Sequence, residues 1–182
     1  RDCLYPIQHN GIWEFYKLHL STHWVSQEID LSKDINDWES LTDNEKHYIK
    51  YGLSFFASSD FIINESQKKD STEINILEYQ FFNDDKISRE NIHSTVYADL
   101  LEAYIKDESE KESLKNAVSN ISTIKRKAEW MREYIKSGTF VERIIAEAIM
   151  EGIFFSGTFC AIFWLRKRGI MSGLCDSNEL IS

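Results

Sequence analysis

Apolar residues recur at helical spacing along most of the chain, and this pattern predicts an all-α protein. The chain has a single proline, at position 6, so long helices can run without interruption. We expect the polar residues 67–72 to form a loop. The periodic runs predict helices over 42–66, 74–106, 109–119, 122–137 and 140–168.

Local signals mark where several of these helices begin and end. Thr42 and Glu45 have the spacing of a capping box and open the first helix. Ser137 and Gly138 stop the helix over 122–137, because glycine favours helix ends. Basic residues at 166–168 followed by Gly169 are typical of a helix C-terminus and close the last run.

Composition narrows the class of protein. The 182 residues are 42% hydrophobic, which is enough for one sizeable core and predicts a single domain over residues 1–182. The net charge of -9 disfavours nucleic-acid binding, because phosphate recognition relies on clustered basic residues. Cys3, Cys160 and Cys175 form no closely spaced pair, which favours reduced thiols over a disulfide or zinc scaffold.

The start of the chain lacks the basic and then apolar pattern of a signal peptide. We also find no apolar run of roughly 18 residues of the kind that spans a membrane. The expectation is therefore a cytoplasmic protein with no membrane partner.

Two acidic residues stand in apolar surroundings, where an unpaired charge is costly. Asp60 follows Phe55 and Phe56 on a predicted helix, and it either kinks the helix, bonds to a nearby serine, or binds a cation. Glu151 lies in a dense apolar run, and it either pairs with a buried arginine or binds a cation.

A third element is the pair Glu90 and His93, which are three residues apart on one helix and therefore project the same way. This spacing alone is common and weak evidence for a metal site. Three long helices that each supply an inward acid are stronger evidence, because this is the ligand arrangement of di-iron carboxylate bundles. An oxygen-rich set of ligands suits iron or manganese better than zinc or copper.

Longer strings resemble the small subunit of class I ribonucleotide reductases. The resemblance covers essentially the whole chain and rests on five segments: residues 24–34 (WVSQEIDLSKD), 55–60 (FFASSD), 90–94 (ENIHS), 151–157 (EGIFFSG) and 177–182 (SNELIS). It implies a ferritin-like helical bundle with a centre of two iron ions, manganese being possible. It also implies a homodimer that works with a ribonucleotide reductase large subunit to reduce ribonucleotides to deoxyribonucleotides.

The resemblance implies a role for each site residue. The metal ligands would be Asp60, Glu90, His93 and Glu151, with Glu90 bridging the two ions. Tyr97 would carry the stable radical, and its spacing supports this, since Glu90, His93 and Tyr97 form one stripe on a helix. Without the resemblance, Tyr97 would be read as ordinary core.

Three aromatic residues complete the implied site. Trp24 would lie on the electron-transfer route from the surface, although a lone tryptophan is otherwise a packing residue. Phe155 and Phe159 share the stripe of Glu151 and would surround the radical, where excluding water protects a reactive species. The histidines at positions 9, 19, 23 and 47 match no ligand position and are expected to be surface or core residues.

The chain also departs from the family pattern. The family has a second Glu-x-x-His after the Asn-Glu-Leu-Ile-Ser string, so we expect the domain to be truncated before its last ligand helix. Residues 83–86 (NDDK) and Arg89 stand before the ligand motif, where the family has mostly uncharged residues. Glu147 occupies a usually apolar position, and Phe61 replaces a small residue.

Three functions remain open at this point. The first is a radical-generating small subunit. The second is a radical-deficient paralogue that acts as a structural partner, because added charges beside a metal site can abolish its chemistry. The third, a di-iron oxidase outside the family, needs a substrate cavity beside Glu151.

Overall fold

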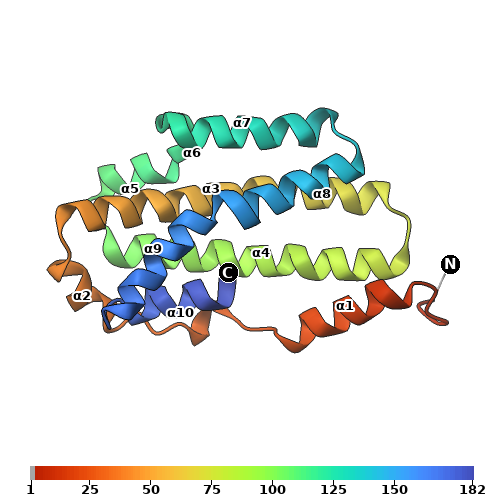
Figure 1. Ribbon diagram of the computed structural model, residues 1–182, viewed down its shortest axis with the longest axis horizontal. Helices are drawn as coiled ribbons and strands as arrows, with labels where there is room; N and C mark the ends of the chain where they lie inside the picture. Colours follow the sequence, from red (N-terminus) through yellow and green to blue (C-terminus); the bar gives the residue numbers. More distant parts are fainter. Residues whose placement is uncertain (1–2) are drawn as a thin grey trace.

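The computed structural model describes residues 3–182, and Figure 1 shows them as a bundle of helices. No strand occurs in this range, so the all-α prediction is confirmed. Arg1 and Asp2, which open the segment searched for a signal peptide, lie outside the described residues.

Two long helices form the centre of the bundle: α3, Asp43–Glu73, and α4, Leu77–Tyr104. They are joined by a short connection and run antiparallel along the long axis of the molecule (Figure 1). Their shared face buries apolar side chains such as Phe56, Ile63 and Leu100, which are fully enclosed. Burial of this face is the main stabilising contribution to the pair.

The remaining helices surround this pair (Figure 1). Helix α1, Asn10–Ser21, lies along α4, while α7, Ser122–Ser137, and α8, Phe140–Ile149, pack on α3. The shorter elements are α2 (Asp34–Ser40), α5 (Glu108–Lys115), α6 (Ala117–Asn120), α9 (Ser156–Lys167) and α10 (Ser172–Ile181). Helices α1, α2 and α10 are not among the helices that the apolar pattern predicts.

The helix ends that the local sequence signals mark, at Thr42, Gly138 and Gly169, are confirmed. Thr42 Oγ1 accepts a hydrogen bond from the amide of Glu45, whose carboxylate accepts one from the amide of Thr42. Gly169 follows α9 with φ +71°, the left-handed conformation that glycine adopts at low cost. At Gly138 a side chain would lie 2.7 Å from the carbonyl oxygen of Tyr134, so only glycine fits.

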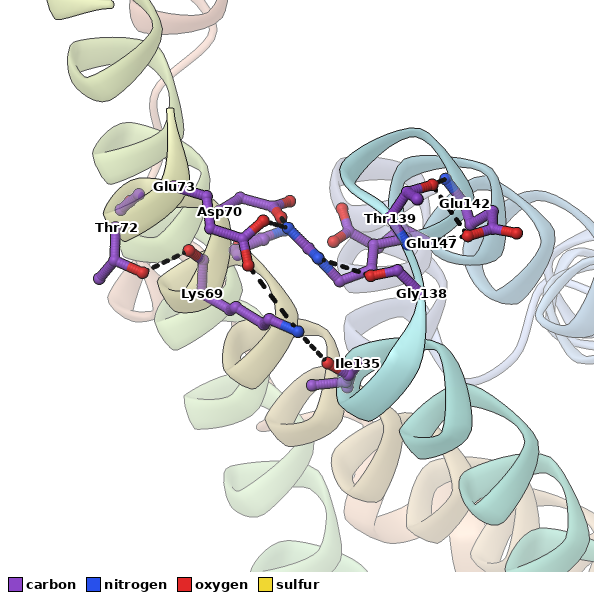
Figure 2. Close-up of polar contacts among 12 residues, drawn as sticks. Lys69, Asp70, Thr72, Glu73, Ile135, Gly138, Thr139, Glu142 and Glu147 are labelled. Atoms are coloured by element: carbon purple, nitrogen blue, oxygen red, sulfur yellow. Dashed lines mark hydrogen bonds and ion pairs between the residues drawn. The ribbon is translucent and has the colours of Figure 1, made fainter. Parts of the chain in front are cut away.

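The predicted loop over 67–72 is wrong, because α3 continues as a helix to Glu73. The reason is a buried ion pair that sequence periodicity does not reveal. The guanidinium of Arg143 on α8 donates to Asp70 Oδ1 (2.8 Å from Nε) and to Glu73, and both acceptors lie on the last turns of α3 (Figure 2). Asn83 of α4 also donates to the carbonyl oxygen of Gln67, at 2.7 Å.

The helix predicted over 140–168 is present but changes geometry in its middle. Between α8 and α9, residues Met150–Phe154 form a π-helical turn that contains Glu151. Such turns are rare in proteins, and those that do occur are frequently found at functional sites. The predicted helix over 109–119 is instead two pieces, α5 and α6, which are separated at Asn116.

The expectation that no segment could span a membrane is wrong on length and composition. The helical stretch Phe140–Lys167 is 28 residues long and contains a window of 18 residues that is apolar enough to cross a membrane. Only 22% of that window is buried inside the described structure. One such helix is weak evidence, because the core helix of a soluble protein passes the same test.

Asp34 fixes the end of the chain that carries α10. Its buried carboxylate accepts hydrogen bonds from the amides of Gly173 and Leu174, each at 2.8 Å, and from the hydroxyl of Tyr104 at 2.6 Å. A carboxylate at a helix N-terminus accepts hydrogen bonds from free backbone amides, and its negative charge is attracted by the positive end of the helix dipole. Asp34 therefore joins α2, α4 and α10.

We predict that Arg143→Met lowers the free energy of unfolding by about 3–5 kcal/mol, because Asp70 then remains buried without a counter-charge. Chemical denaturation followed by circular dichroism measures this. The matched control is Lys125→Met, which breaks an exposed pair with Glu129 and costs less than about 1 kcal/mol. Equal losses in both variants would contradict the structural role of the buried pair.

Candidate metal centre

The packing of α3 on α4 brings three predicted ligands together. Asp60 on α3 and Glu90 and His93 on α4 each offer one ligand atom, and these atoms all lie within 4.8 Å of one another. All three residues are buried, with Asp60 only 1% exposed. Helix spacing places Glu90 and His93 one turn apart, and the imidazole Nδ1 of His93 lies 3.2 Å from Glu90 Oε2.

The polar atoms of this cluster are not satisfied by the described residues. Asp60 Oδ2 and His93 Nε2 are buried and have no hydrogen-bond partner within residues 3–182. Buried polar atoms are nearly always paired in native proteins, so an unpaired carboxylate oxygen facing an imidazole calls for a ligand. Two carboxylates and an imidazole fit a divalent transition metal such as iron or manganese.

The alternatives for Asp60 are not supported. Helix α3 runs through Asp60 without interruption, from Asp43 to Glu73, and the nearby hydroxyl of Ser58 donates instead to the carbonyl oxygen of Ser54. Burial, together with the negative charges of Glu90 and Glu151, raises the pKa of Asp60 well above its ordinary value. Without a bound cation the site therefore favours a protonated Asp60.

Glu151 lies outside this compact group but lines the same pocket of about 360 Å³, together with Asp60, Glu90 and His93. Unlike the other three residues, Glu151 is exposed at the mouth of this pocket. The protein atoms packed around its carboxylate and the charge of Glu90 nevertheless raise the pKa of Glu151 to about 8. The alternative pairing with a buried arginine is not observed, because the guanidinium of Arg143 binds Asp70 and Glu73.

Tyr97 stands one turn beyond His93 on α4, is buried, and contacts the edge of an aromatic cluster through Phe56. Its ring lies 5.2 Å from that of Phe56, which in turn lies 4.6 Å from Phe155 and 4.8 Å from Phe159. The Tyr97 hydroxyl is buried and has no hydrogen-bond partner among the described residues. Phe56 is a site residue that the sequence prediction does not include. The signal was present, because Phe56 lies four residues before Asp60 and therefore on the same helix face.

Trp24 lies directly on the cluster. Its indole stacks on the imidazole of His93, with ring centroids 5.8 Å apart and an angle of 21° between the planes. Trp24 is 5% exposed, so it is also a core residue. The family resemblance implies a place for Trp24 on an electron-transfer route, which stays a prediction, and the structure brings Trp24 into contact with a candidate ligand.

The four remaining histidines are not part of the cluster found within residues 3–182. His9, His23 and His47 are exposed, and His19 pairs with Asp85 of α4. The unusual charges before the ligand motif also have partners, since Arg89 donates to the carbonyl oxygen of Thr22 and Lys86 lies 3.4 Å from Glu147.

We predict that Tyr97→Phe changes the free energy of unfolding by no more than about 1 kcal/mol, because the hydroxyl that is removed makes no hydrogen bond. The control is Tyr104→Phe, which removes a buried bond to the carboxylate of Asp34 and costs about 1.5–3 kcal/mol. Both are measured by urea denaturation of metal-free protein. A large loss for Tyr97→Phe would show that its hydroxyl has a strong partner.

Comparison with known proteins agrees with this geometry. The family model for the small chain of ribonucleotide reductase matches residues 1–182. The chain is 52% identical over 185 residues to a ribonucleoside-diphosphate reductase small subunit of Dictyostelium discoideum, and 48% identical over 184 residues to a small chain of Monkeypox virus. It is covered completely in both alignments but spans only 55% and 58% of these relatives.

Solved structures share the fold. A ribonucleotide reductase homodimer from Saccharomyces cerevisiae superposes with a TM-score of 0.87 at 32% identity, over 98% of this chain and 57% of that one. A dimanganese(II) protein from Streptococcus sanguinis gives a TM-score of 0.84 over 99% of this chain and 62% of that one, and at 19% identity it supports the fold alone. The predicted ferritin-like helical bundle is confirmed, and the chain belongs to the family of ribonucleotide reductase small chains.

Proposed function

We propose that this chain carries the metal-binding and radical-generating part of a ribonucleoside-diphosphate reductase small subunit. The observation that carries the proposal is the buried pair of atoms Asp60 Oδ2 and His93 Nε2, which have no partner among the described residues and lie beside Glu90. Tyr97 follows His93 by one turn of α4. The full activity is reduction of ribonucleotides to deoxyribonucleotides with a large subunit as partner.

In this proposal Asp60, Glu90, His93 and Glu151 hold a pair of metal ions, iron or alternatively manganese. A second Glu-x-x-His motif would complete the ligand set and stays a prediction. When bound, the metal pair supplies with oxygen the oxidising power for removal of one electron from a phenol. The protein contributes ligand positions and a dry interior, because water beside the site would quench a reactive species.

Tyr97 is the proposed radical site. Burial, followed by the charges of Asp60 and Glu90, raises the pKa of Tyr97 well above its ordinary value of 10.0. The phenol is therefore neutral, and a radical formed from it would have lost one electron and one proton. Phe56 packs on the Tyr97 ring, and Phe155 and Phe159 pack on Phe56, so this aromatic cluster helps to keep water from the phenol.

Trp24 provides the proposed connection to the large subunit. Its stacking on His93 gives an uninterrupted contact between an aromatic ring and a candidate ligand. A second copy of the chain is the other proposed partner. Apolar side chains on the outer face of α8, the π-helical turn and α9 support this, since Val141, Ile145, Ile153 and Trp164 are 53–63% exposed.

We predict that Tyr97→Phe in the full-length gene product abolishes a tyrosyl radical but retains about two irons per chain. The measurement is iron content with low-temperature electron paramagnetic resonance after anaerobic iron loading and exposure to oxygen. Tyr104→Phe, a buried tyrosine on the same helix, is the control and keeps the signal. Bound iron without a radical in the wild type would instead support the structural paralogue or another oxidase.

We predict that Glu90→Gln weakens metal binding by at least about tenfold, because a carboxylate ligand is replaced by a neutral amide. Asp84→Asn removes an exposed acid from the same helix and leaves the affinity unchanged. Manganese(II) titration calorimetry on both variants measures this. Equal affinities in wild type and Glu90→Gln would remove Glu90 from the ligand set.

A further inference from the structure

Lys86 lies at the edge of the candidate metal cluster, between Glu147 and the pocket that Glu90 and Glu151 line. Its ammonium lies 3.4 Å from Glu147 Oε2, and its side chain lines a pocket of about 530 Å³ together with Glu90, His93 and Glu151. Lys86 is 25% exposed, whereas the side chain of Glu147 is 5% exposed. The pair joins α4, which carries two candidate ligands, to α8, which leads into Glu151.

The other cations near this region are engaged elsewhere. Arg143 binds Asp70 and Glu73, both labelled in Figure 2, at the far end of α8. Arg89 lines the same pocket as Lys86, but its guanidinium donates to the backbone carbonyl oxygens of His19 and Thr22. Of these two cations, Lys86 is the one that lies against a carboxylate of α8.

Carboxylates outnumber cations on this side of the cluster. Glu90 and Glu151 act on Asp60, Glu90 and Glu147 act on Glu151, and burial raises the pKa of Asp60, Glu147 and Glu151. Lys86 opposes this increase at both Glu147 and Glu151. Glu147 Oε1 is buried and has no hydrogen-bond partner in residues 3–182, so Lys86 is its principal compensation.

We propose that Lys86 is a built-in counter-charge of the metal centre: anchored by Glu147, its ammonium offsets the charge of Glu90 and Glu151 and limits how tightly divalent metal is held. The inference rests on the proposed metal site. A fixed positive charge beside a cation site opposes binding through Coulomb repulsion, and a fixed negative charge favours it. Neither Lys86 nor Glu147 has to touch the metal for this effect.

The test is a double-mutant cycle on the full-length gene product, with manganese(II) titration calorimetry as the measurement. Lys86→Met tightens manganese binding by about tenfold, and Glu147→Gln weakens it by about tenfold, as expected for one unit charge near a cation site. The double variant returns to within about threefold of the wild type, because the two charges are removed together.

Two controls separate charge from structure. Lys86→Arg keeps the positive charge and retains the wild-type affinity. Lys125→Met makes the same change in net charge on an exposed surface and has no effect. A purely structural role for Lys86 would weaken binding in Lys86→Met, since a disturbed site holds metal less well.

The outcomes are distinguishable. Unchanged or weaker binding in Lys86→Met overturns the inference while leaving the metal site intact. If Lys86→Met fails to fold, Glu147→Gln and the double variant test the inference. Weaker manganese binding in Glu147→Gln, with recovery in the double variant, supports it. Any other result overturns it. No manganese binding in the wild type would defeat the proposed ligand set and this inference together.

Discussion

The packing of α3 against α4 is the constraint on which the site depends, because it encloses Asp60, Glu90 and His93 in a space with little water. Two carboxylate charges about 4 Å apart repel by roughly 4 kcal/mol at an effective dielectric constant of about 20. This repulsion is acceptable only if a proton or a cation compensates it. The same apolar contacts that stabilise the helix pair therefore create the demand for a ligand.

The described residues include two buried clusters of ionisable side chains, and they differ in whether a partner of opposite charge is present. At one end, Asp70 and Glu73 receive the guanidinium of Arg143, so the group is closed and joins α3 to α8. At the other, Asp60 and His93 keep atoms without a partner in the described chain. A closed group contributes to structure, whereas an open group at similar depth is suited to binding a cation.

The sequence was a good guide where helical periodicity alone decides the outcome. Spacing within one helix placed Glu90, His93 and Tyr97 on a single stripe, and apolar context identified Asp60. It failed where a distant partner decides: residues 67–72 look like a loop because their polarity is visible, but the arginine that buries Asp70 lies 73 residues away. Periodicity also gave no sign of the π-helical turn at Glu151, because the residues around it are almost all apolar and the shift in phase that an added residue causes cannot be seen.

The segment from α8 to α9 inverts the usual arrangement of a surface helix. Arg143, Glu147 and Glu151 follow one another at intervals of four and so form a charged stripe. The first two are buried and the third opens on the metal pocket, whereas Val141, Ile145 and Ile153 on other faces are exposed. The two buried charges each have a partner, Asp70 for Arg143 and Lys86 for Glu147. The stripe thus changes along one helix from a closed ion pair, through a pair that opens on a pocket, to a candidate ligand, and this progression connects the packing of the bundle with the charge around the candidate metal site.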